Sequence, residues 1–529
     1  MAKDCNQEND TGYPYADISK KEKECEIGPI SPDKRRDEAL EIRMEAAFYQ
    51  KDLPIPKQLC NGDEKRFLNK IANFSKALPH NDYGEVELHA YKKWIKALKK
   101  GKSSAFERLI LGGTAKLANP QAAYAYGLEG PDSHHLSVAV PPAFSSAWEA
   151  SEMAELYWHA LLRDVPFAEY DTNPLAIVAA SDLSSFSDFR GPKIGGVVTT
   201  GTLFRGETSS DLTGPYISQF LWKDMPYGAA TMVQKYRTAL PDKDYMTSYE
   251  EWLNIQNGSS SQKMLFDSTS RYIRNGRDLG EFVHQDFSYQ ACLSACLMLL
   301  SFGEAALSPS NPYLHSKTQK GFVTFGAPHI LDLVGRTAKA ALEAAWFQKF
   351  LVHRRIRPEE FGGRVHNELA GAVHYPIHSE LLNSQAVSEV FNRFGTYLLP
   401  MAYPEGCPTH PAYPSGHASI LGAGVTVLKA FFNESFVIPQ PVVANTDGLS
   451  LLPYLGQPLK VGDELNKLAS NIGIGRNIAG VHWRSDMTEG LKLGEAVAIG
   501  ILHDYKATYN ERFCGFTFTK FDGTTITVH

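Results

Sequence analysis

The stretch Pro414-Ser415-Gly416-His417 leads directly into the apolar run 418–432, which has the pattern of a buried helix. Ser415 is a suitable N-cap residue for this helix, and Gly416 allows the backbone to come close to a ligand. The amides of the first turn and the helix dipole then point at an anion, and His417 is placed to exchange protons with it. An ordinary helix start with a hydrogen-bonded histidine explains this stretch equally well when it is taken alone.

A basic segment lies upstream of this helix. If the helix predicted over 329–355 continued to Arg357, Lys349, His353 and Arg357 would occupy positions i, i+4 and i+8 of one stripe. Pro358 disfavours helical backbone angles at Arg357, so the helix is expected to end there and Arg357 to turn into a cleft with Lys349 behind it. The neighbouring pair Arg354-Arg355 favours the alternative, a basic face exposed to solvent, when this segment is taken alone.

A third segment lies downstream and contains Arg476, His482 and Asp486. His482 and Asp486 are one helical turn apart, so the carboxylate can accept one imidazole N–H and leave the other nitrogen free to bond an electrophilic centre. Arg476 cannot share a helix face with His482, which predicts a bend at Gly480. A surface His–Asp pair is the alternative interpretation.

Together the three segments supply three fixed cations, a hydroxyl group, a glycine amide and two imidazoles. Burying three cations without a partner is costly, so a bound polyanion is expected to neutralise them. Arginine forks and a lysine point charge suit an oxyanion with several equatorial oxygens, either tetrahedral or trigonal-bipyramidal. A divalent metal cation is disfavoured, because the cluster is cationic and poor in carboxylates.

The composition is that of a globular protein. The 529 residues are 43% hydrophobic and 21% charged, with a formal net charge of -6, so nothing indicates a nucleic-acid partner. Residues 1–10 lack the apolar core of a signal peptide, and the apolar run 289–307 is interrupted by Gly303 and Glu304. We therefore expect a soluble chain without membrane insertion, in a compartment that the sequence leaves open. The seven cysteines do not have zinc-site spacing.

The pattern of apolar residues and breaks predicts a mainly α fold. A polar arm is expected over 1–32, an N-terminal helical part over 33–320, a helical bundle carrying the site over 321–512 and a β-hairpin over 513–529 around Asp522-Gly523. Ser31-Pro32-Asp33 is a plausible helix start. Segments 191–240 and 435–462 are rich in Gly and Pro and are expected to be connections. Helices are predicted over 34–49, 65–76, 87–99, 143–163, 245–255, 285–302, 329–355, 378–396, 417–433, 463–472 and 485–508.

Two of these stretches resemble the vanadium-dependent haloperoxidases, and most closely the algal and cyanobacterial bromoperoxidases. They are Trp346-Phe-Gln-Lys349-Phe-Leu-Val-His353-Arg-Arg-Ile-Arg357-Pro-Glu and Pro408-Thr-His410-Pro-Ala-Tyr-Pro414-Ser-Gly-His417-Ala. Further segments, including 155–167, 214–220 and 274–278, extend the resemblance from about residue 33 to the end. It implies two four-helix bundles with the anion site in the second, and a homo-oligomer that is a dimer or larger.

The resemblance also implies roles for the site residues. Vanadate would be bonded to His482, with His417 as the acid–base group and Lys349 also polarising the peroxide. The residues implied to hold the vanadate oxygens are Lys349, Arg357, Ser415, Gly416 and Arg476. Asp486 and His353 are expected behind the site, and Asp278 is a candidate partner of Arg476 by family analogy alone. Trp346 and His410 are candidate halide-tuning residues, although a core aromatic is an equally good interpretation of Trp346.

The implied activity is oxidation of bromide and iodide by hydrogen peroxide to hypohalous acid equivalents that halogenate small organic acceptors. Vanadium would stay at +5 as a Lewis acid, without haem or flavin. One alternative is a phosphomonoesterase with His482 as nucleophile and His417 as general acid, disfavoured because phosphatases of this superfamily usually have one residue fewer between Lys349 and Arg357. Another is an oxyanion-binding protein without turnover. The sequence fixes neither the halide range nor the organic acceptor.

Overall fold

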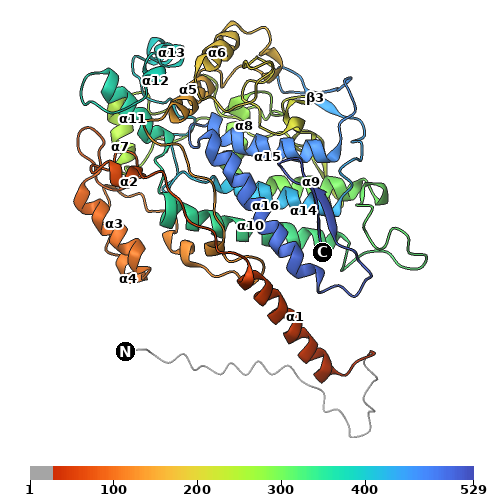
Figure 1. The fold of residues 1–529 in the computed structure, drawn as a ribbon. Coiled ribbons are helices and arrows are strands. Elements are labelled where there is room, and N and C mark those ends of the chain that lie inside the picture. Colours follow the sequence, from red (N-terminus) through yellow and green to blue (C-terminus); the bar gives the residue numbers. More distant parts are fainter. Residues whose placement is uncertain (1–27) are drawn as a thin grey trace.

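The protein is mainly α-helical (Figure 1). The computed structural model describes residues 28–529, so most of the predicted polar arm lies outside the described residues. The α-helices are Pro32–Asp52 (α1), Asp63–Arg66 (α2), Leu88–Lys100 (α3), Ser103–Phe106 (α4), Ala147–Leu161 (α5), Pro174–Ser185 (α6), Tyr249–Gln256 (α7), Gly276–Gln285 (α8), Gln290–Ser301 (α9), Ala327–Phe347 (α10), Pro358–Leu369 (α11), Ser379–Leu382 (α12), Gln385–Phe394 (α13), Gly416–Phe431 (α14), Val461–Ile478 (α15) and Arg484–Lys506 (α16).

Shorter elements connect these helices. A π-helix, Gln348–His353 (η7), continues α10. The 3-10 helices are Pro120–Tyr124, Ser133–His135, Phe167–Glu169, Ser209–Leu212, Gln219–Leu221 and Glu304–Ala306. Three antiparallel strand pairs are present in the described residues: Met225–Tyr227 (β1) with Ala230–Met232 (β2), Val442–Ala444 (β3) with Leu451–Pro453 (β4), and Phe516–Thr519 (β5) with Thr525–Val528 (β6). The last pair confirms the predicted C-terminal hairpin, in which Phe516 lies opposite Val528.

Helices α10, α14, α15 and α16 pack together as a bundle, which we call the central bundle. Glycines allow α14 and α16 to cross closely, because a Cβ at Gly422 would overlap the Leu491 carbonyl oxygen and one at Gly494 would overlap that of Ser419. The same contact surface includes Gly490, where a Cβ would lie 2.8 Å from the Ser415 oxygen. The close crossing therefore holds the start of α14 against the first half of α16.

Gly494→Ala is expected to lower the free energy of unfolding by about 1–3 kcal/mol, the usual cost of overpacking a tight core. The measurement is thermal unfolding of the purified variant. Gly335→Ala in α10 is the matched control, because a Cβ there meets open space and alanine favours the helix by about 0.5–1 kcal/mol. A Gly494→Ala protein as stable as the Gly335→Ala protein would contradict the close crossing.

A second group of helices lies beside the central bundle and consists of α5, α6, α12 and α13. Although α12 and α13 follow α10 in the chain, they pack against α5 rather than on the central bundle. Almost every residue of α5 is buried, including Glu149, Glu152 and Glu155. Helix α8, which precedes all four helices of the central bundle in the chain, packs on α15. Both groups therefore contribute to the interior around the predicted site.

Helix α1 begins as predicted, since the Ser31 side chain accepts a hydrogen bond from the Lys34 amide (3.3 Å) and Pro32 occupies the first turn. It extends away from the rest of the molecule in Figure 1. Leu40, Met44 and Phe48 are 55%, 46% and 50% exposed, respectively. An apolar stripe thus lies on a helix that the body of the described chain does not cover.

Two predictions of secondary structure were wrong for clear physical reasons. The helix predicted over 65–76 is reduced to α2. The residues that follow α2 lie instead against the segment after η7, where the Phe74 amide donates to the Arg354 carbonyl (3.0 Å). Helix α11 was not predicted, since Gly362 and Gly363 lower helix propensity. A Cβ at Gly363 would overlap the Trp252 ring, so close packing requires glycine there. Helices α6 and α8 were also missed.

In residues 28–529, no helix is both long enough and apolar enough to cross a lipid bilayer.

Candidate active site

A cavity of about 450 Å³ opens between the central bundle and the segment that follows α8. We call it the central cavity. Its lining includes residues that were not singled out from the sequence, among them the acidic Asp286 and Glu405 and the aromatic Tyr403. Six predicted site residues line it: Trp346, His410, Gly416, His417, Arg476 and His482. Lys349, Arg357, Ser415 and Asp486 are each 0% exposed, and hydrogen bonds connect Arg357 to His410 and Asp486 to His482 in the lining.

The three predicted cations are buried without a carboxylate partner in the described part of the chain. Lys349 donates to the carbonyl oxygens of Pro411 (2.9 Å) and Ala412 (2.7 Å). Arg476 donates from one terminal nitrogen to the Val283 carbonyl (2.8 Å), and its buried Nε has no partner in residues 28–529. Such uncompensated charge is costly unless an anion shares the site.

The π-helix η7 places Lys349. The chain leaves the α-helical path at Gln348, and Arg354 ends the turn in the left-handed region with φ 45°. The helix ends before Arg357, as Pro358 predicted, so Lys349, His353 and Arg357 do not form a continuous helical stripe. Burial, together with Arg357 and Arg476, lowers the pKa of Lys349 well below its usual value.

Arg357 is the N-cap residue of α11 and has the extended backbone expected before a proline. Its guanidinium donates to the carbonyl oxygens of His410 (2.9 Å) and Val481 (2.5 Å). It also approaches the imidazole nitrogens His482 Nε2 (3.2 Å) and His410 Nδ1 (2.9 Å). Arg357 thus connects the two histidines that line the floor of the central cavity.

His482 lies in the turn between α15 and α16, which bends at Gly480 (φ 84°) as predicted. The predicted hydrogen bond is confirmed, since His482 Nδ1 lies 2.7 Å from Asp486 Oδ2. A donor at Nδ1 leaves Nε2 with a lone pair that faces the cations. Burial and the neighbouring Arg357 and Lys349 lower the pKa of His482 well below its usual value, so the ring is neutral at neutral pH.

The start of α14 has the predicted geometry. Ser415 is the N-cap residue and accepts from the Ala418 amide (3.4 Å), while its own amide donates to the Asp486 carbonyl (2.8 Å). His417 lies in the first turn with its side chain 26% exposed, and its Nε2 lies 3.0 Å from Asp286 Oδ1. No local pattern marks Asp286, which follows α8 and meets His417 only through the tertiary fold.

Known proteins match almost the whole chain. The model of the VCPO second helical-bundle domain matches residues 333–511. A vanadium-dependent bromoperoxidase of Ascophyllum nodosum is 35% identical, over 94% of this chain and 93% of the relative. The chain belongs to the vanadium haloperoxidase family. A vanadium-dependent bromoperoxidase of Corallina pilulifera is likewise 35% identical, over 93% of this chain and 98% of the relative.

A solved haloperoxidase structure supports the same family assignment. The homohexameric second vanadate-dependent bromoperoxidase (AnII) of Ascophyllum nodosum superposes with a TM-score of 0.91. It is 30% identical in sequence, and the superposition covers 96% of this chain and 93% of the other. The fold expected from the resemblance is therefore confirmed in its mainly α class.

Three predictions about residues behind the haloperoxidase site need correction. Asp278 does not pair with Arg476: it lies 3.2 Å from Arg274 and accepts from Thr238 (2.5 Å). His353 packs on the Tyr413 ring, and its two nitrogens have no partner in the described chain, so it does not bond a site residue.

The third correction concerns the arginine pair that follows η7 in this haloperoxidase. Instead of forming a solvent-exposed face, Arg355 is 3% exposed and bonded to buried carboxylates. Arg354 is partly buried and paired with Glu64. Spacing along a helix was misleading because η7 ends the helix before this pair and turns both side chains inward.

Trp346 and His410 lie next to each other in the lining of the central cavity. Their ring centroids are 4.7 Å apart with an interplanar angle of 42°. Trp346 Nε1 donates to the Ala118 carbonyl (3.1 Å), which fixes the indole. Burial, then Arg357 and Lys349, lowers the pKa of His410 well below its usual value, so this ring is also neutral.

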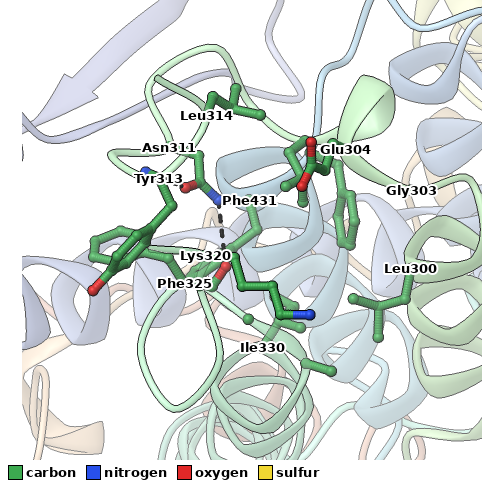
Figure 2. Close-up of a pocket in the computed structure, with 15 residues that line it drawn as sticks. Leu300, Gly303, Glu304, Asn311, Tyr313, Leu314, Lys320, Phe325, Ile330 and Phe431 are labelled. Carbon is green, nitrogen blue, oxygen red and sulfur yellow. Dashed lines mark hydrogen bonds between the residues drawn. The ribbon is translucent and has the colours of Figure 1, made fainter. Parts of the chain in front are cut away.

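A second cavity, of about 210 Å³, is shown in Figure 2. It lies where α9 and α14 end and α10 begins, and Phe325, Ile330 and Phe431 give it a mostly apolar lining. The Asn311 side chain reaches across to donate to the Phe325 carbonyl (3.3 Å). No predicted site residue lines this cavity, so the central cavity is the candidate active site.

Proposed function

We propose that this protein is a vanadate-dependent bromoperoxidase that oxidises bromide and iodide with hydrogen peroxide. It releases hypohalous acid equivalents, which halogenate small organic acceptors. The observation that carries the proposal is the set of buried cations Lys349, Arg357 and Arg476, without carboxylate partners in the described residues, beside a cavity whose lining includes His410, His417 and His482.

The residues fit vanadate. Lys349, Arg357 and Arg476 would supply charge for its oxygens, and Arg476 Nε, which has no partner in residues 28–529, would be a donor available to one of them. Ser415 and Gly416 add a hydroxyl and a first-turn amide at the start of α14. The neutral His482 offers Nε2 as the ligand to vanadium. When bound, vanadate supplies Lewis acidity at a fixed +5 oxidation state.

The chain's own residues then manage protons and charge. Asp286 accepts from His417 Nε2 and so leaves Nδ1 free to take a proton from hydrogen peroxide. Lys349 and the two arginines stabilise negative charge on the bound oxygens, in a site closed to water at its floor. Trp346 and His410 form the wall that the halide meets, and we propose that they tune which halide is oxidised.

Vanadate dependence is the direct test. After chelator treatment, bromination of a 1,3-diketone dye with peroxide and bromide is expected to vanish, to return with added orthovanadate and to fall when phosphate competes for the same cations. Cleavage of an aryl phosphate without halogenation would instead indicate a phosphomonoesterase with His482 as the nucleophile. Vanadate binding with neither activity would indicate an oxyanion-binding protein.

We also propose that the protein is a homo-oligomer. The similar Ascophyllum nodosum structure is homohexameric, and the exposed stripe of Leu40, Met44 and Phe48 on α1 is apolar surface that a subunit contact can cover. Sedimentation analysis measures the subunit number directly.

A further inference from the structure

Arg355 is buried at the centre of a polar cluster behind the central cavity, and nothing in the activity described so far uses it. One terminal nitrogen donates to Asp486 Oδ1 (2.8 Å) and to the Ser485 hydroxyl (2.8 Å). The other donates to Glu149 Oε2 (2.5 Å) and Glu152 Oε2 (3.0 Å). A single guanidinium therefore bridges three carboxylates that come from α5 and α16.

The two oxygens of the Asp486 carboxylate bind different partners. Its Oδ2 accepts from His482 Nδ1 (2.7 Å) and from the Trp483 amide (3.0 Å). In residues 28–529 its Oδ1 has one hydrogen-bond donor, Arg355. Because a carboxylate is planar, fixing Oδ1 also fixes the direction in which Oδ2 faces the imidazole.

Arg355 is itself held from several sides. Its guanidinium lies 4.8 Å from the Trp483 ring centroid, and Trp483 Nε1 donates to the Ile356 carbonyl (3.0 Å). Glu152 is anchored by the Ser485 amide (2.9 Å) and hydroxyl (2.8 Å). These contacts hold the guanidinium in place, so it can fix the position of the Asp486 carboxylate.

The charge of the cluster is consistent with this arrangement. Burial raises the pKa of Glu149 to about 8, an effect that Arg355 opposes and Glu152 reinforces. Glu149 therefore carries a proton for much of the time at neutral pH, and the guanidinium faces fewer than three full negative charges. A protonated Glu149 repels the Asp486 carboxylate less and competes less with it for the guanidinium.

We propose that Arg355 is a positioning residue: through Asp486 it fixes the ring orientation and tautomer of His482, and the α5 glutamates anchor it. This proposal rests on the proposed vanadate site. Its consequence is that the vanadium ligand is aligned from outside the matched domain 333–511, because Glu149 and Glu152 lie on α5.

Arg355→Lys and Arg354→Lys form a matched pair that tests the proposal. The two arginines are adjacent and each is ion-paired, but Arg354 bonds Glu64 and not Asp486. Lysine keeps the charge and loses the fork that reaches Ser485, Asp486 and both glutamates at once. We expect vanadate to bind chelator-treated Arg355→Lys about 10–100-fold more weakly than wild type, as for other partners of a ligating histidine. Arg354→Lys is expected to bind as wild type does.

A readout without vanadate separates positioning from simple loss of structure. The ¹⁵N shifts of the histidine rings in the vanadium-free protein report the tautomer of His482 directly. We expect the Nδ1–H form in wild type and Arg354→Lys, and a mixture of tautomers in Arg355→Lys. A folded Arg355→Lys protein with wild-type His482 shifts and wild-type vanadate affinity would overturn the proposal. Failure of wild type to bind vanadate would instead overturn the proposed function.

Two further variants keep the test decisive. Asp486→Asn removes the intermediate carboxylate, so adding Arg355→Lys to it is expected to weaken vanadate binding no further; an additive loss would overturn the proposed route. If Arg355→Lys does not fold, Ser485→Ala removes one support of the same guanidinium nitrogen. It is expected to shift the His482 signals in the same direction by a smaller amount, and unchanged signals would count against the proposal.

Discussion

His482→Ala is expected to abolish vanadate retention and bromide oxidation together. The variant removes the neutral imidazole nitrogen, 3.2 Å from the Arg357 guanidinium, that we assign as the ligand to vanadium. The measurement is the vanadium content after gel filtration, followed by bromination of the diketone dye with excess orthovanadate.

The matched control for this prediction is His503→Ala. His503 stacks on Tyr49 (3.5 Å between centroids) at the surface and lines no part of the central cavity. It should retain vanadium and activity at the wild-type level. A His482→Ala protein that brominates normally would end the assignment of this histidine as the ligand.

His417→Ala is expected to lower the bromination rate about 10²–10⁴-fold, the usual contribution of a general acid–base group, while the protein still retains vanadate. The three cations and His482 are untouched in this variant, so the oxyanion keeps its charge partners. The measurement compares turnover at saturating peroxide with the vanadium content of the same sample.

The contrast between the two histidine variants is the sharper observation. One is expected to lose vanadium and activity, and the other activity alone. Equal loss of vanadium in both would mean that His417 holds the oxyanion rather than exchanging protons. Asp286→Asn is a milder change, made at the partner of His417, because the amide oxygen still accepts from His417 Nε2.

Several parts of the site could be predicted because they depend on short spacings. His482 and Asp486 are four residues apart at the start of one helix, and Ser415 directly precedes the helix that it caps. Gly480 was expected to bend the chain because Arg476 and His482 cannot share a helix face. These are local constraints, which the fold did not override.

The parts that were missed depend on contacts between distant segments. Asp286 meets His417 across 131 residues of sequence, and Arg355 meets Glu149 across 206. No local pattern distinguishes these residues from surface charges. The π-helix η7 was also not predicted, although the end of the helix before Arg357 was expected from Pro358.

Helix prediction failed for a related reason. α11 contains adjacent glycines that weaken the local preference for a helix, yet these glycines are what lets it approach Trp252 and Leu399. The requirement comes from packing partners that the sequence does not place nearby. Long alanine- and leucine-rich helices such as α10 and α14 were predictable, since their composition and burial agree.

The uncompensated cations affect the stability of the folded protein before it binds its cofactor. An anion that binds the folded chain and not the unfolded chain stabilises it by mass action, by about 2.7 kcal/mol when its concentration is 100 times its dissociation constant. A newly made chain that lacks vanadate holds Lys349, Arg357 and Arg476 together against their mutual repulsion. We expect phosphate, another tetrahedral oxyanion, to stabilise the vanadium-free protein at these cations, so that uptake of the cofactor would exchange one oxyanion for another.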